Sequence, residues 1–187
     1  MMDIAEMFQK LGVVPVVVLE DTKDAVPLAK ALVEGGLPCA EVTFRTEAAE
    51  ESIRLMTEQF PEMLVGAGTV LTKEQVDAAA AADAKFIVSP GFDPEIVDYC
   101  LKKEIPVYPG CVSPSEVAQA VKRGLKFMLT GGINAKNLEE YLSCFYPKII
   151  GVNTHIHIQK KAEPGSNAEF CFLLQRKREL DNFSNSY

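Results

Sequence analysis

The chain has 187 residues, of which 48% are hydrophobic, and it carries a net charge of -7. This length suits one domain with a sizeable core and is short for two. The negative charge, without any run of lysine or arginine, excludes the electrostatic pattern of proteins that bind nucleic acid or anionic membranes. We therefore expect a small molecule as the ligand.

The longest apolar run, VVPVVVL from Val13, is far shorter than the roughly 20 residues that a membrane span needs. No charged-then-apolar leader opens the chain, so we expect a cytoplasmic protein without membrane contact. The five cysteines are odd in number, scattered, and contain no CxxC pair. They indicate neither a disulfide framework nor a zinc site, and we expect no metal and no cofactor.

Short runs rich in β-branched residues recur along the chain, and their starts lie about 20 to 26 residues apart, which suits one strand and one helix per unit. These runs cover residues 13–19, 39–44, 63–70, 85–91, 105–110, 126–132 and 148–152. Between them, TKEQ from Thr72 and SPSE from Ser113 are capping boxes that begin helices. Gly35, Gly36 and Gly124 are typical helix ends.

Strands that alternate with helices and show little polar alternation predict a parallel sheet covered by helices. Two architectures fit, a doubly wound open sheet and a (β/α)₈ barrel of the TIM type. No GxGxxG follows the first strand, as a dinucleotide fold would favour. Several strands end instead in glycine or proline turns, at the edge where a barrel gathers its active site. We therefore predict an α/β fold of the barrel type.

The segment AEVTFRT is unusual for a buried strand because period-two geometry places Glu41, Thr43 and Arg45 on one face. In a barrel that face points inward or onto the rim. A glutamate held there can move protons, and an arginine fork suits a substrate carboxylate. An ion pair between Glu41 and Arg45 at the rim is the structural alternative.

Two glycine turns can bring backbone amides close to a ligand: GAGT, residues 66–69, and LTGG, residues 129–132. The second precedes a helix that Asn134 can cap, which would suit a phosphate. Each turn also has a purely structural explanation. His155 and His157 lie two residues apart without a third ligand, so a metal site is not expected there.

The motifs VVPVVV, EVTFRT, VGAGTV, SPG, YPG and TGGI follow one another in the order and spacing of a known family. From about Val13 to Gly151 the chain resembles the bacterial 2-keto-3-deoxy-6-phosphogluconate (KDPG) aldolases, also described as 4-hydroxy-2-oxoglutarate (KHG) aldolases. The resemblance implies a class I aldolase on a (β/α)₈ barrel, usually a homotrimer. Such an enzyme forms a Schiff base and releases pyruvate from a keto acid or phosphosugar acid.

The resemblance also implies the roles of individual residues. Glu41 would be the general acid and base, Arg45 and Thr69 would surround the pyruvyl carboxylate, and Pro90 would contribute to substrate binding. Gly131 and Gly132 would hold the phosphate. The amine that forms the Schiff base begins the sixth strand of the family, in a segment that reads close to KFFPAE.

This chain departs from the family at that segment. SPSEVAQAVKRGL runs directly into KFMLTGGI, so Lys126 is the nearest amine, and a count without gaps from YPG reaches Leu129 at the lysine position. Because TGGI follows at once, KFM resembles the start of the seventh strand. We predict an incomplete barrel that lacks strand six and its helix, on the order of 20 to 25 residues by the repeat spacing. Lys126 is then either the entry residue of strand seven or a substitute for the Schiff-base lysine.

After Gly151 the resemblance ends, so we predict an aldolase-like barrel domain over residues 1–152 and a divergent tail over residues 153–187. FCFLLQRKREL in the tail has helical spacing. The expected activity is cleavage of KDPG to pyruvate and glyceraldehyde 3-phosphate, or of KHG to pyruvate and glyoxylate. A 2-keto-3-deoxy-6-phosphogalactonate aldolase, or an inactive or truncated relative that binds pyruvate or phosphate, are the alternatives.

Overall fold

The structure is a computed structural model that describes residues 3–130 and 149–155. Its described strands form one seven-stranded sheet in the order β5-β4-β3-β2-β1-β7-β6, and every pairing is parallel. The strands are β1 Val13–Val17, β2 Cys39–Thr43, β3 Leu64–Gly68, β4 Ile87–Ser89, β5 Val107–Pro109, β6 Phe127–Thr130 and β7 Ile149–His155. The prediction of a parallel α/β sheet from the seven recurring runs is confirmed.

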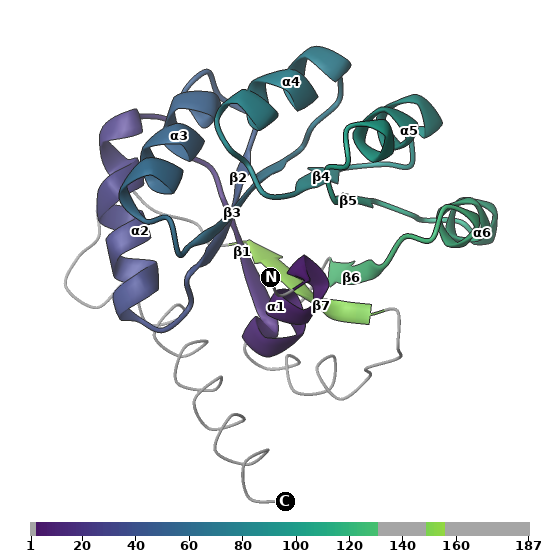
Figure 1. Cartoon of the computed structure of the whole chain (residues 1–187), viewed down its shortest axis with the longest axis horizontal. Helices are drawn as coiled ribbons and strands as arrows, with labels where there is room; N and C mark the ends of the chain where they lie inside the picture. Colours follow the sequence, from purple (N-terminus) through teal and green to yellow (C-terminus); the bar gives the residue numbers. More distant parts are fainter. Residues whose placement is uncertain (1–2, 131–148, 156–187) are drawn as a thin grey trace, which may run out of the picture.

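Helices surround the outer side of the curved sheet, while α1 lies across one end of it (Figure 1). The described helices are α1 Ile4–Leu11, the 3₁₀ turn η1 Thr22–Asp24, α2 Ala25–Glu34, α3 Ala49–Gln59, α4 Lys73–Ala81, α5 Pro94–Lys102 and α6 Pro114–Lys122. Strand and helix alternate along the chain, so each crossover returns the chain to the same edge of the parallel sheet.

The predicted N-cap residues Thr72 and Ser113 are confirmed, but only one of the two predicted capping boxes is complete. Ser113 caps α6 with a complete capping box, in which Glu116 accepts from the Ser113 backbone N–H. Thr72 caps α4 by accepting from the Gln75 N–H, but the Gln75 side chain accepts from Leu71 instead. Both arrangements satisfy backbone N–H groups that a helix start leaves unpaired.

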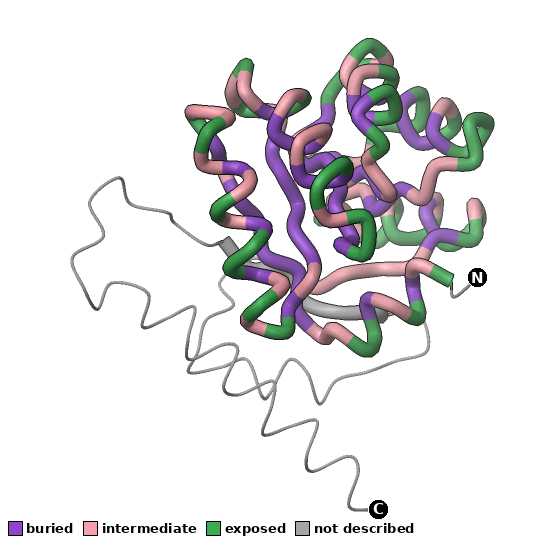
Figure 2. The backbone as a smooth tube through the Cα atoms, turned by 60° about the vertical axis from the view of Figure 1, so that its left-hand side comes forward, coloured by how far each residue is buried: buried purple, intermediate pink, exposed green. Residues whose placement is uncertain are grey.

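The sheet carries two apolar layers, and the central strands β1, β2 and β3 between them are buried along their length (Figure 2). Along β2, Ala40 and Val42 belong to the layer that packs against the outer helices, whereas Cys39 belongs to the layer under α1. Side chains alternate in a strand, so Glu41 and Thr43 share the inner face with Cys39. The period-two prediction is therefore confirmed for Glu41 and Thr43, whereas Arg45 lies in the turn after the strand.

Helix α1 closes the inner face at the amino ends of the strands. Its Phe8 makes edge-to-face contacts with Phe86 and Tyr108, at ring-centroid distances of 4.9 and 5.4 Å. These rings pack with residues at the starts of β1, β2 and β3. Helix α1 is not predicted from the sequence, although Asp3 as N-cap and Gly12 at φ 71° mark both of its ends.

Strands β5 and β6 follow each other in the chain yet form the two opposite edges of the described sheet. Strand β6 pairs with β7, which pairs with β1, so these two strands stand where the seventh and eighth strands of a barrel would. The interruption lies between β5 and β6, where none of the described residues forms a strand. The prediction of an incomplete barrel is confirmed. The expected domain limit after residue 152 falls inside β7.

Candidate active site

Glu41 is a buried carboxylic acid on the inner face of β2, with 3% of its surface exposed. Its position pairs with Val16 of β1 and Gly66 of β3, so it lies between two neighbouring strands. The Phe86 ring packs against Gly66 and fills the inner face beside it. A carboxylic acid on the inner face of a barrel strand lies where barrel enzymes place their active-site groups, which makes Glu41 the first candidate for chemistry.

Gly68 leaves the space that the Glu41 carboxylate occupies. A Cβ at residue 68 would overlap Oε1 of Glu41 and crowd its Cγ and Cδ. The two glycines of GAGT thus make room for side chains, Gly66 for the Phe86 ring and Gly68 for the acid. From the sequence, the GAGT glycines are expected to form either a ligand contact or a plain turn, and this packing role is not predicted. The alternation of glycine along β3 is the signal that could have indicated it.

Arg45 is the second residue after β2 and is exposed, and hydrogen bonds hold the residues on both sides of it. The Phe44 N–H donates to the Gly68 carbonyl at 2.8 Å, and the Thr46 hydroxyl donates to the Leu19 carbonyl. The buried Thr43 hydroxyl donates to the Val17 carbonyl at 3.2 Å. Arg45 is exposed, so its side chain reaches solvent at the rim, whereas Glu41 is buried.

Thr69, directly after β3, adopts φ 57°, in the left-handed region that β-branched residues avoid. Asp83 and Glu104 share this sign of φ, but both follow helices, where such a residue commonly ends the helix. Thr69 instead stands at the carboxyl end of a strand, next to Gly68 and half-buried. Strain of this kind costs on the order of 1–3 kcal/mol and tends to accumulate at functional sites.

Backbone hydrogen bonds join the carboxyl ends of successive strands and bring the candidate residues to one edge. The Val70 N–H donates to Val88 at 3.2 Å, and the Gly110 N–H donates to Ser89 at 2.8 Å. A Cβ at Gly110 would overlap the Pro90 carbonyl, so the SPG and YPG turns pack on each other. Pro90 is exposed there, at the same edge as Arg45 and Thr69.

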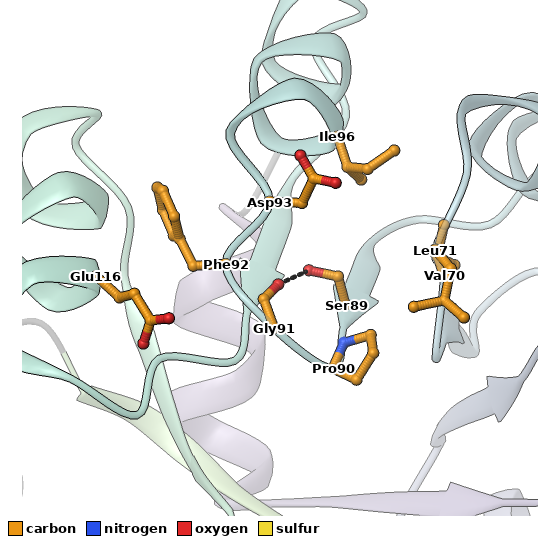
Figure 3. A pocket seen from close by; sticks show the side chains of 9 residues that line it. All are labelled: Val70, Leu71, Ser89, Pro90, Gly91, Phe92, Asp93, Ile96 and Glu116. Atoms are coloured by element: carbon orange, nitrogen blue, oxygen red, sulfur yellow. Dashed lines mark hydrogen bonds between the residues drawn. The ribbon is translucent and has the colours of Figure 1, made fainter.

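A pocket of about 270 Å³ lies beside this edge (Figure 3), and its lining residues Val70 and Ile96 belong to the outer apolar layer. Its walls include Pro90 and Phe92, and its two carboxylates come from Asp93 and Glu116. Both acids already accept backbone N–H groups at helix starts, and those of Val112 and Ser113 lower the pKa of Glu116. Because Glu41, Arg45 and Thr69 do not line this pocket, we place the candidate site on the inner face.

Lys126 lies apart from this group of residues. It precedes β6 at the amino end of the sheet, where its Nζ donates to Asp3 of the α1 N-cap at 3.0 Å. The ammonium group is the main reason that the pKa of Asp3 is below its usual value. The carboxyl ends of the strands, which hold Arg45, Thr69 and Pro90, are the opposite edge of the sheet. The structure therefore does not bring Lys126 to the other candidate residues.

Several predicted features lie outside the described residues: Gly131, Gly132, Asn134, His157 and the tail helix. Leu129, at the counted position of the family lysine, is in β6 and pairs with Val152. Among the described residues no group of three or more His, Cys, Asp or Glu is arranged to hold a metal ion. No described helix is both long and apolar enough to cross a membrane.

Comparison with known proteins identifies the family. The sequence model of the KDPG and KHG aldolases matches residues 4–128. A 2-dehydro-3-deoxy-phosphogluconate aldolase of Treponema pallidum is 40% identical over 177 positions that cover 80% of this chain and 83% of the relative. A protein of the same name from Haemophilus influenzae is 35% identical and covers 88% of this chain and 89% of the relative.

Solved structures agree with the sequence relatives. The KDPG aldolase of Legionella pneumophila, with pyruvate captured as a covalent carbinolamine, superposes with a TM-score of 0.77 at 33% identity and covers 94% of this chain and 96% of that one. The enzyme of Zymomonas mobilis with 3-phosphoglycerate gives a TM-score of 0.79 at 29% identity and covers 92% and 94%.

The alignments also measure what this chain lacks. The 177 positions matched to the T. pallidum relative hold about 150 residues of this chain, which is 80% of 187, so about 27 positions have no counterpart here. The KHG/KDPG aldolase of Escherichia coli gives the same difference, 158 positions against about 131 residues. This deficit is the size of one strand and helix, as the interrupted sheet requires. The described sheet lacks one strand of a complete barrel, and the chain belongs to the KDPG and KHG aldolase family.

Proposed function

We propose that this chain binds 2-keto acids of the KDPG and KHG type at the carboxyl ends of β2, β3 and β4. The observation that carries the proposal is the burial of Glu41 on the inner face, in the space that Gly68 leaves. Glu41 is the group that moves protons, and Arg45 and Thr69 bind the keto-acid carboxylate. The reaction class is cleavage of KDPG to pyruvate and glyceraldehyde 3-phosphate, or of KHG to pyruvate and glyoxylate.

This reaction requires an amine beside Glu41. A lysine adds to the keto carbon and loses water to form an iminium, which accepts the electron pair when the carbon-carbon bond breaks. A carboxylate takes and returns the protons of these steps. Within residues 3–130 and 149–155, no strand contains a lysine and every lysine is at least partly exposed.

A second candidate function follows from Lys126, which is held by Asp3 at the amino end of the sheet. We propose that this lysine is structural and that the chain by itself binds pyruvate without forming an imine. This is the reading that the geometry supports best for the isolated chain. The Legionella relative's carbinolamine supports the keto-acid chemistry of the family, not an amine in this chain.

Borohydride trapping with pyruvate separates the two candidates. The chain is reduced in the presence of pyruvate and its peptides are read by mass spectrometry, while pyruvate binding is titrated by calorimetry. We expect saturable binding without a pyruvyl adduct on any lysine. An adduct on Lys126 that disappears in Lys126→Met would replace the second candidate with the first.

The matched variants for binding are Arg45→Met and Arg54→Met. Arg54 lies on α3 and pairs with Glu51 and Glu58. We expect Arg45→Met to weaken pyruvate binding about tenfold or more, the loss of a charge-assisted pair, and Arg54→Met to leave it unchanged. Absence of binding in the unaltered chain contradicts both candidates.

Two further measurements follow. Coupled assays with KDPG, KHG and the galactonate epimer test turnover. Analytical ultracentrifugation tests the homotrimer that the family resemblance predicts.

A further inference from the structure

Helix α6 presents an apolar face that no described element covers. Pro114, Val117, Ala118 and Val121 follow the spacing i, i+3, i+4, i+7 of a helix that packs on one side, and all four are exposed. Val117 and Val121 are 40% and 39% exposed. Helix α5 has the same length of 9 residues and buries three of them, whereas α6 buries only Ala120.

This face points away from the rest of the helix ring. On its other side α6 is joined to α5 by Arg123, whose guanidinium pairs with Asp98 and stacks on the Phe92 ring. At about 100° per residue, Arg123 lies roughly opposite the midpoint of the apolar face. Figure 1 shows α5 on one side of α6 and no described helix on the other. The apolar face is therefore where the next helix of the ring would pack.

The strands on either side of α6 in the chain, β5 and β6, also lack a described neighbour on one side. β5 and β6 are the edges of the described sheet, and each leaves one row of backbone groups without a described strand as partner. All five residues of each of the strands β1, β2 and β3 are buried, while no residue of β6 is fully buried. Because β5 and β6 are both parallel to the rest of the sheet, one further parallel strand could pair with both.

We propose that this surface, formed by the edges of β5 and β6 and by the apolar face of α6, docks a strand followed by a helix from another polypeptide chain. Its strand pairs between β5 and β6, and its helix packs on Val117 and Val121. The occupant is a unit of about 27 residues, because that is the length by which the relatives exceed this chain within the alignments. The proposal concerns docking and does not require the proposed keto-acid function.

The test uses the full chain and a synthetic peptide, the about 27 residues of the T. pallidum relative that have no counterpart here. Binding is measured by fluorescence anisotropy, and hydrogen exchange with mass spectrometry locates it. We expect micromolar binding and slower exchange in residues 107–109 and 127–130. A peptide with proline in its strand should not bind, because proline cannot donate to the ladder.

Val121→Glu and Leu101→Glu form the matched pair, since both side chains are 39% exposed and Leu101 lies on α5. We expect Val121→Glu to weaken peptide binding at least tenfold and Leu101→Glu to leave it unchanged. Equal affinity of the two variants, or no peptide binding, overturns the proposal.

Two other outcomes also overturn it. If β5 and β6 are protected from hydrogen exchange without peptide and at every protein concentration, other residues of this same chain cover the surface. Protection that rises with protein concentration and is lost in Val121→Glu assigns it to a second copy. None of these readouts involves pyruvate, so failure of docking and failure of the proposed function are distinguishable.

Discussion

The Glu41 carboxylate occupies the space beside Gly68 that the side chain of any larger residue at position 68 would fill. The acid and the glycine come from paired strands, in which Glu41 is opposite Gly66 and Thr43 is opposite Gly68. The shape of the inner face thus depends on a residue without a side chain. This relationship makes Gly68 a positioning residue for the acid.

Gly68→Ala should push the Glu41 side chain out of its place and lower the free energy of unfolding by about 1–3 kcal/mol, the usual cost of an added group in a packed core. Urea unfolding measures it. Gly91→Ala is the control, because nothing lies within 4 Å of a Cβ at that glycine. In a Glu41→Ala background the cost of Gly68→Ala should fall, and an equal cost in both backgrounds would show that the acid is not what the new methyl group meets.

Thr69→Gly should relieve the left-handed backbone and raise stability by up to about 1 kcal/mol, since L-residues lose roughly 1–2 kcal/mol in that conformation. The same substitution should weaken pyruvate binding, because the hydroxyl is removed. Asp83 and Glu104 also have positive φ angles, so Asp83→Gly and Glu104→Gly serve as controls. They should gain stability without any change in binding. Weaker binding in all three variants would mean that Thr69 has no specific role.

The ion pair between Lys126 and Asp3 should contribute at most about 1 kcal/mol, because both groups are largely exposed. Lys126 lowers the pKa of Asp3 in the folded chain, so this stabilisation is present above the unfolded pKa of about 3.9 and is lost as pH falls through the folded value. The stability difference between the unaltered chain and Lys126→Met should therefore vanish in acid. Lys122→Met, on the exposed face of α6, should show no such pH dependence.

Ser52 on α3 is fully buried, and its hydroxyl has no hydrogen-bond partner in the described structure. Removing an unsatisfied buried hydroxyl is neutral or favourable, and alanine is also the better helix former. Ser52→Ala should thus raise the free energy of unfolding by up to about 1 kcal/mol in urea titration. Thr57→Ala is the contrasting case, because the Thr57 hydroxyl donates to the Ala82 carbonyl and its removal should destabilise. A loss of stability in Ser52→Ala would show that its hydroxyl has a partner.

Local signals determined most of the secondary structure. β-branched runs, Ser113 and Thr72 as caps, and glycines 35, 36 and 124 mark element types and ends through backbone preferences that act within a few residues. Period two also placed Glu41 and Thr43 on one face of β2. Helix α1 has local end signals too, in Asp3 and Gly12, but its place across the inner face depends on contacts with Phe86 and Tyr108, which are distant in the chain.

The sequence by itself determined the alternation of strands and helices, the family, and the absence of one unit near residue 125. Spacing and motif order express these features without any knowledge of contacts. Tertiary structure decided what Gly66 and Gly68 are for, that Arg45 faces solvent while Glu41 is buried, and that Lys126 lies with Asp3 at the amino end. Those outcomes depend on pairing between strands about 25 or more residues apart, and in Lys126 on a partner 123 residues away. A local pattern such as the alternating glycines of β3 does not say which distant side chain fills the space.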